Sequence, residues 1–116
     1  MTIDKATLEQ YRDIMGDEYS EFALDIIDTF LESSPKTIIE LRKAFKDQDA
    51  KSFERAAHTL KSNANLFGAN KLSEIALDLE NLGKSGETNN AAKRINELLA
   101  EYTKVIEELN DFRNEL

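Results

Sequence analysis

Residues 53–69, FERAAHTLKSNANLFGA, decide how this chain folds. At about 100° per residue in an α-helix, their apolar side chains fall on one face. That face consists of Phe53, Ala56, Ala57, Leu60, Ala64 and Phe67. His58, the only histidine of the chain, lies about 140° from the centre of the face by the same arithmetic. The pattern therefore predicts a helix over about residues 50–67 that buries its apolar face and leaves the imidazole in water.

Apolar residues recur at helical spacing along the rest of the chain, and no segment alternates at the period of a strand. Thr7-Leu8-Glu9-Gln10 is a capping-box pattern, and Gly16 is a suitable helix end. The pattern predicts further helices over about residues 7–15, 18–33, 35–46, 71–82 and 91–113. The glycine-bearing polar run over 83–90 is predicted to be a loop. We expect an all-α fold, one domain over residues 1–116, with four longer antiparallel helices as its core.

Three positions are predicted to set helix ends. Pro35 suits the first position of a helix and disfavours the helical conformation for Ser34. The sequence leaves open whether the chain breaks or only bends there. Asp49 and Asn70 are of the residue types that cap the helices that follow them.

Composition narrows the range of partners and compartments. Asp and Glu outnumber Lys and Arg by 23 to 15, which gives a net charge of −8. This balance disfavours nucleic acid and anionic membrane surfaces as partners. There is no cysteine, no apolar run of the roughly 18 residues that a membrane span needs, and no signal-peptide pattern at the start. We expect a soluble cytoplasmic protein.

Most enzyme chemistries lack the residues they need. Ser62 is one turn from His58 on the same exposed helix, where no oxyanion hole is available. With one histidine and no cysteine, no metal site is expected. Gly83-Lys84-Ser85 looks like the end of a phosphate-binding loop, but Asp78 stands where that motif requires glycine. No nucleotide site is predicted.

An exposed histidine beside a lysine can carry a phosphoryl group. The neutral imidazole is a good nucleophile near neutral pH. Lys61, one turn on, is placed to offer a charge to the phosphoryl oxygens, and Ser62 and Asn65 could donate hydrogen bonds. Gly68 would keep the surroundings low enough for a second protein to approach. The alternative is a surface histidine with no role.

The stretch Ala57-His58-Thr59-Leu60-Lys61-Ser62, followed by Gly68-Ala69, resembles the signature of histidine-containing phosphotransfer (HPt) domains. In that family the phosphoaccepting histidine is followed by lysine at +3, glycine or serine at +4, and glycine at +10. Lys61, Ser62 and Gly68 stand at those offsets.

The resemblance implies an up-and-down antiparallel four-helix bundle with one or two short additional N-terminal helices. It implies that His58 accepts a phosphoryl group from the aspartyl phosphate of a receiver domain and passes it to another receiver aspartate. Lys61 would neutralise phosphate charge, and Gly68 would leave room for the receiver. The partners would be response-regulator receivers and a hybrid sensor histidine kinase. The domain would be a monomer without kinase or ATPase activity and without a cofactor, because the magnesium belongs to the receiver.

Two questions stay open at this point. A helical adaptor that binds a receiver without passing phosphate, or an unrelated helical bundle, would share much of the pattern. The receiver-docking surface is predicted to include Met15, Leu24, Ile27 and Leu31, from the early helices. The alternative is that both apolar strips of the helix over 18–33 pack on neighbouring helices.

Overall fold

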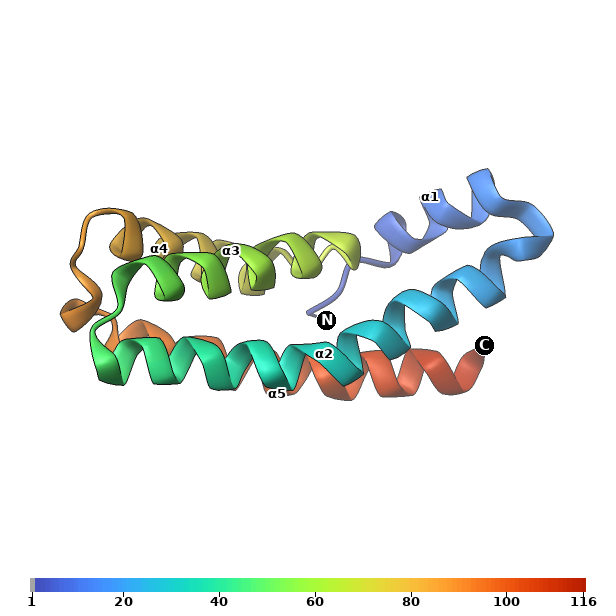
Figure 1. Ribbon diagram of the computed structural model, residues 1–116. Helices are drawn as coiled ribbons and strands as arrows, with labels where there is room; N and C mark the ends of the chain where they lie inside the picture. The colour runs from blue at the N-terminus through green and yellow to red at the C-terminus, as the bar shows by residue number, and fades with distance from the viewer. Residues whose placement is uncertain (1) are drawn as a thin grey trace.

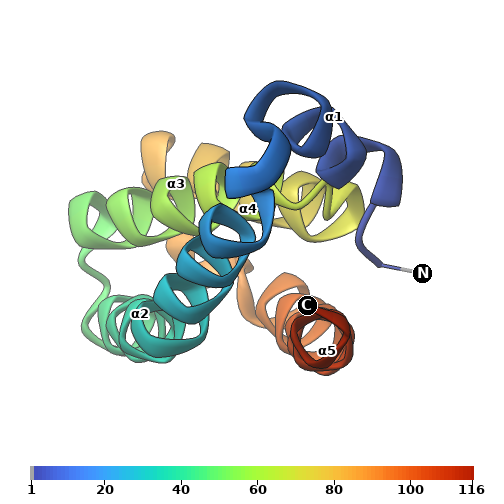
Figure 2. The same ribbon diagram turned by 90° about the vertical axis from the view of Figure 1, so that its right-hand side faces the viewer.

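The computed structural model describes residues 2–116, and within them the chain is helical with no strand. The elements in order are α1 (Lys5–Met15), η1 (Gly16–Glu18), α2 (Tyr19–Asp47), α3 (Ala50–Leu66), α4 (Asn70–Lys84), η2 (Thr88–Asn90) and α5 (Ala92–Glu115). Helices α2 to α5 run up and down as a four-helix bundle, with α3 and α4 in one layer and α2 and α5 in the other (Figures 1 and 2). The short elements α1 and η1 precede the bundle, as predicted.

The apolar faces of the four long helices meet in one core. Large side chains from every helix of the bundle are fully buried there, among them Leu41, Phe53, Leu79 and Leu98. Each such side chain contributes roughly 1.5–3 kcal/mol through burial. This core fixes the rotation of α3, and therefore which of its residues face solvent. No helix among the described residues is long and apolar enough to cross a membrane.

Helix α2 passes through Pro35 without interruption, so the chain does not break at Ser34-Pro35, and the segments predicted over 18–33 and 35–46 form one helix. Ser34 is helical and fully buried, and its hydroxyl lies 2.6 Å from the hydroxyl of Tyr102 on α5. Pro35 is on the exposed side of the helix, where a missing backbone donor costs least. The helix changes direction along its length instead of ending (Figure 1). Packing of the flanking turns against α5 outweighs the local preference of the proline.

Helix α3 begins as predicted. The side chain of Asp49 accepts hydrogen bonds from the backbone N–H of Ser52 at 3.1 Å and from its hydroxyl at 2.7 Å. These bonds hold the pKa of Asp49 below its ordinary value. The cap therefore fixes the first turn of the helix that carries His58.

Two predicted caps are wrong. Helix α1 begins at Lys5, before the Thr7 pattern, because the side chain of Asp4 accepts the backbone N–H of Ala6 at 2.9 Å. Asn70 is the first residue of α4 and not its cap. The chain enters α4 directly from the tight turn at Gly68, which leaves no extended residue for a side-chain cap.

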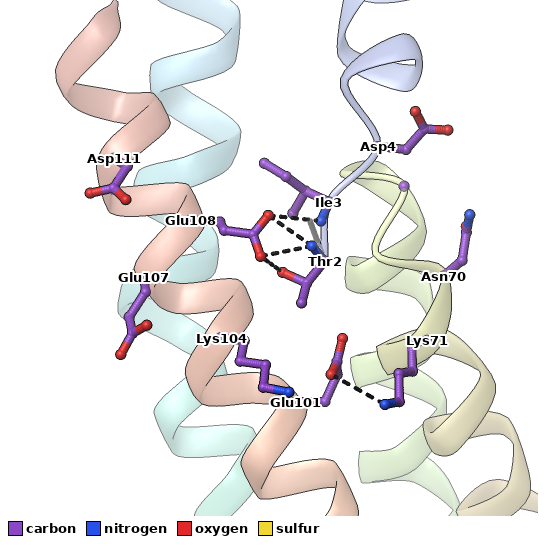
Figure 3. Close-up of a pocket in the computed structure, with 11 residues that line it drawn as sticks. Thr2, Ile3, Asp4, Asn70, Lys71, Glu101, Lys104, Glu107, Glu108 and Asp111 are labelled. Carbon is purple, nitrogen blue, oxygen red and sulfur yellow. Dashed lines mark hydrogen bonds and ion pairs between the residues drawn. The ribbon is translucent and has the colours of Figure 1, made fainter.

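The segment before α1 is fastened to the bundle (Figure 3). Ile3 is buried in the core, and the backbone N–H of Asp4 donates to the carbonyl of Phe67 at 3.1 Å. The Glu108 carboxylate accepts the backbone N–H of Thr2 at 2.8 and 2.7 Å. Burial raises the pKa of Glu108, but the hydrogen bonds from Thr2 outweigh burial and lower it. The N-terminal segment thus covers the turn between α3 and α4.

Gly68 lies under this segment. Its φ is +62°, in the left-handed region that favours glycine. A Cβ added at Gly68 would come within 2.5 Å of the Asp4 Cβ and 2.6 Å of the Thr7 Oγ1. Both its backbone conformation and the space around it therefore require glycine.

We expect Gly68→Ala to lower the free energy of unfolding by roughly 2–4 kcal/mol, the sum of a left-handed alanine and an overpacked contact. Gly86→Ala is the matched control, because Gly86 has φ +72° at the end of α4 but nothing within 4 Å of an added Cβ. It should cost only about 1–2 kcal/mol. Urea denaturation of both variants measures the difference, and equal losses would contradict the packing account.

Candidate functional site

His58 lies on the outer face of α3, as predicted. Its side chain is 58% exposed, whereas Ala57 and Leu60 on the same helix are fully buried. The helix therefore presents the imidazole to solvent from a backbone that the core holds in place.

Glu80 of α4 bonds both the histidine and the lysine of the motif. One of its carboxylate oxygens lies 2.8 Å from His58 Nδ1, and the other accepts a hydrogen bond from Lys61 Nζ at 2.6 Å. The Glu80 side chain is only 5% exposed. An ionised carboxylate can only accept, so the imidazole proton lies on Nδ1. The lone pair of Nε2 is then free to act as a nucleophile.

The charge on Glu80 follows from its partners. Burial raises the pKa of this carboxyl, but the hydrogen bonds from Lys61 and His58 outweigh burial and hold the pKa below its ordinary value of 4.5. Glu80 is therefore ionised at neutral pH. Lys84, one turn further along α4, adds a second cation beside Lys61, with its Nζ 3.9 Å from the carboxylate.

The cationic surroundings extend beyond the predicted residues. A surface depression of about 460 Å³ beside the imidazole is lined by Lys51, Glu54, Arg55, His58, Glu80 and Lys84. Three of these side chains are cations that an anion bound there would meet. Sequence reasoning missed all three, because they come from two helices and share no motif.

Lys61, Ser62 and Asn65 lie on α3 where helical spacing placed them. Lys61 is half-buried and bonded to Glu80, one turn from His58. Ser62 and Asn65 are exposed, and in the described part of the chain neither side chain makes a hydrogen bond. Their hydroxyl and amide groups are therefore available to a group bound at Nε2.

The structure gives Gly68 a different place from the one predicted. It is buried beneath Asp4 and Thr7 of its own chain. The space above it is filled by the N-terminal segment, so the expectation that it leaves room for a partner is wrong. That segment has no motif of its own, and its docking on this turn could not be inferred from the glycine alone.

The predicted docking residues fall in different environments. Ile27 is fully buried and cannot contact a partner, so this prediction is wrong. Leu24 and Leu31 are half-buried, and at about 100° per residue they lie on the side of α2 that also carries Arg42. Arg42 lines the groove between α2 and α5; these two leucines therefore face α5 and not α3. Met15 is half-exposed at the end of α1.

Two other exposed apolar residues, on α3 and α4, point in directions nearer to those of His58 and Glu80 than the predicted docking residues do. Leu66 is 41% exposed on α3, and Leu77 is 40% exposed on α4. By helix geometry, Leu66 is turned about 80° from His58, and Leu77 about 60° from Glu80. Neither residue was predicted, because an exposed leucine inside an apolar pattern is indistinguishable from a core residue.

Glu80 is the main functional residue that sequence reasoning missed. The available signal was its position one turn after Ala76 and one turn before Gly83, both buried on the face of α4 that packs in the bundle. A carboxylate at the edge of an apolar stripe needs a partner. Among residues 2–116, no group of three or more side chains of metal-ligand type is arranged to hold a metal ion.

Comparisons with known proteins match the sequence and the fold of this chain. The model of the Hpt domain family matches residues 25–112. Multistep phosphorelay regulator 1 of Schizosaccharomyces pombe is 26% identical over 112 residues, which cover 95% of this chain and 38% of that protein. The chain thus spans well under half the length of this relative.

Two solved structures share the fold. The crystal structure of histidine-containing phosphotransfer protein B (HptB) from Pseudomonas aeruginosa PAO1 has a TM-score of 0.87 and 25% identity. The HPT domain of a sensor hybrid histidine kinase from Shewanella has a TM-score of 0.81 and 19% identity, a likeness of fold alone. Each comparison covers 99% of this chain and 96% of the other.

The lowered pKa of Glu80 predicts a pH-dependent contribution to stability. Because the folded pKa is below the unfolded one, the contribution is complete above about pH 4.5 and is lost as pH falls through the folded pKa. We expect Glu80→Gln to be less stable than the parent protein at pH 7, and the difference to shrink as pH drops below about 4.5. Urea denaturation at several pH values measures it. A difference independent of pH would contradict an ionised, bonded Glu80.

Proposed function

Because the chain belongs to the Hpt domain family, we propose that it is a phosphorelay intermediate that carries a phosphoryl group on His58 between receiver-domain aspartates. One observation carries the assignment of the residue. The imidazole is exposed, its Nδ1 is bonded to a buried carboxylate, and its Nε2 makes no hydrogen bond to any of residues 2–116. A carrier that exchanges phosphate with other proteins needs this combination, because the reacting atom must be reachable while the ring stays oriented.

The transfer is a displacement at phosphorus. Nε2 of His58 attacks the phosphorus of an aspartyl phosphate, the N–P bond forms, and the P–O bond to the aspartate carboxylate breaks. The Nδ1 proton stays hydrogen-bonded to Glu80, whose negative charge stabilises the positive charge that develops on the ring. In the second transfer an aspartate oxygen of another receiver attacks the phosphorus, and the electrons of the N–P bond return to Nε2.

Lys61 supplies charge to the phosphoryl oxygens in this proposal. Its ammonium is already close to the imidazole through their shared contact with Glu80. A lysine side chain is flexible and presents three donors, so it can bond Glu80 and a phosphoryl oxygen together. Ser62 and Asn65, exposed on the same helix face, would add neutral hydrogen bonds.

The same proposal makes the protein a carrier that depends on its partners for catalysis. We propose that it has no kinase or ATPase activity and needs no cofactor of its own, with the magnesium held by the receiver. Its partners would be response-regulator receivers and a hybrid sensor histidine kinase, and it would act as a monomer. The competing possibility is an adaptor that binds receivers without transfer. The orientation of His58 by Glu80 favours transfer, because an adaptor has no need of a free Nε2.

We expect phosphorylated receiver domain to label the protein with acid-labile, base-stable phosphate, the chemistry of a phosphohistidine. His58→Gln should abolish the label, because the amide nitrogen is not a nucleophile. Thr103→Ala, at an exposed position of α5 away from the imidazole, is the control and should retain it. Radiolabel transfer followed by acid and alkali treatment measures both, and label that survives in the His58→Gln variant would overturn the assignment.

We place the receiver-docking surface on the outer face of α3 and α4. This position is supported by the exposed apolar side chain of Leu77, about 60° from Glu80 on α4, and by that of Leu66, about 80° from His58 and roughly 12 Å further along α3. Apolar residues around a polar centre are typical of transient interfaces. Leu24, Ile27 and Leu31 are left out of this surface because they are buried or face α5.

We expect Leu66→Asp or Leu77→Asp to slow transfer from a phosphorylated receiver by about 10-fold or more, because each charge would be desolvated in the complex. Ile39→Asp is the matched control: Ile39 is 66% exposed but lines the groove between α2 and α5. Transfer rates at subsaturating receiver measure the effect. Equal losses in all three variants would place the docking surface elsewhere.

A further inference from the structure

Gly83 allows α4 to touch the backbone of α3. A Cβ added at Gly83 would lie 2.9 Å from the N, Cα and Cβ atoms of Glu54. Side chains do not approach backbone this closely, and backbone atoms of a helix cannot rotate out of the way. Gly83 is buried inside α4 and is not among the glycines with positive φ. The space, and not the backbone conformation, is therefore what requires glycine here.

This contact lies one turn from the bonds that hold His58. Gly83 follows Glu80 by three residues on α4, and Glu54 precedes His58 by four residues on α3. The two helices are antiparallel neighbours (Figure 1). The Gly83–Glu54 contact and the Glu80–His58 hydrogen bond therefore connect the same two helices about one turn apart. The separation of the helices at Gly83 therefore sets how far the Glu80 carboxylate must reach.

A methyl group at position 83 would widen that gap. Restoring ordinary contact from 2.9 Å requires a local separation of roughly 0.5–1 Å. The hydrogen bonds of Glu80 to His58 and Lys61 are 2.8 and 2.6 Å long, and bonds stretched beyond about 3.2 Å are weak. Because the Glu80 side chain is buried among packed neighbours, it has little freedom to follow by changing rotamer.

We propose that Gly83 is a positioning residue for the phosphoacceptor: it keeps α4 close enough to α3 for Glu80 to hold His58 Nδ1 and leave Nε2 free. The inference deepens the proposed function and rests on it. Glycine weakens a helix relative to alanine. Its presence in the last turn of α4 is accounted for by this close approach.

The test measures the imidazole directly. In protein with ¹⁵N-labelled histidine, the chemical shifts of Nδ1 and Nε2 report which nitrogen carries the proton, and His58 is the only histidine. At pH values at which the ring is neutral, we expect the parent protein to show predominantly the Nδ1–H form. Gly83→Ala should shift the population toward the Nε2–H form that dominates in free histidine, and should slow phosphotransfer at least several-fold.

A double-mutant cycle separates positioning from a general structural effect. If Gly83 acts through Glu80, then Gly83→Ala should change neither the tautomer population nor the transfer rate further in a Glu80→Gln background. Additive effects in the two backgrounds would overturn the proposal. Val105→Ala is the stability control, because it opens the core on α5 and should leave the tautomer population unchanged.

Glu80→Asp keeps the inference testable even if Gly83→Ala does not fold. It withdraws the carboxylate by one methylene group without touching the α3–α4 contact, and should reproduce the shift in tautomer population. An unchanged tautomer population would mean that the distance from the carboxylate to His58 Nδ1 does not control the tautomer, and would overturn the proposal. The ¹⁵N measurement involves no phosphate, so it tests the positioning role of Gly83 separately from phosphotransfer. The positioning role can be disproved while His58 still accepts phosphate. It can also be supported while the labelling experiment fails.

Discussion

The site depends on the hydrogen bonds that the carboxylate of Glu80, buried between α3 and α4, makes with His58 and Lys61. An unpaired ion in this position would cost several kcal/mol. Here both oxygens are bonded, one to His58 Nδ1 and the other to Lys61 Nζ. The charge therefore stays on the carboxylate at neutral pH, and the two residues that bond it are fixed relative to each other. The close approach of α3 and α4 is what brings the three groups together.

The imidazole has to meet two opposed requirements. It must be exposed for another protein's aspartate to reach it, and an exposed side chain normally samples several rotamers. Each ring nitrogen meets one of these requirements: Nδ1 is held by the buried carboxylate, and Nε2 is left for the partner's aspartate. One strong hydrogen bond thus removes most of the rotational freedom of His58 without covering its reactive atom. The rotation of α3 that makes this possible comes from the packed face of Phe53, Leu60 and Phe67.

The sequence was sufficient for most of the fold and for the exposed half of the site. The apolar period of 3.6 residues located the helices, and the exposure of His58 followed from its angle to the stripe on α3. Whether the chain breaks or bends at Pro35 stayed open, because no local pattern records the contact between Ser34 and Tyr102. Glu80 was missed because its partners lie 22 and 19 residues earlier in the chain. No local pattern records that two helices bring these residues into contact.

The two buried glycines show how a motif can be right and its explanation wrong. Gly68 belongs to the motif around His58, and an open surface for a partner seemed the natural reason for it. In the structure its missing side chain makes room for Asp4 and Thr7, and Gly83 in the same way makes room for Glu54. Both glycines therefore act inside the chain, Gly68 at the end of α3 and Gly83 beside the second turn of α3. The phosphoacceptor helix is held against its neighbours at both places, which keeps the imidazole in a fixed position while its outer face stays open.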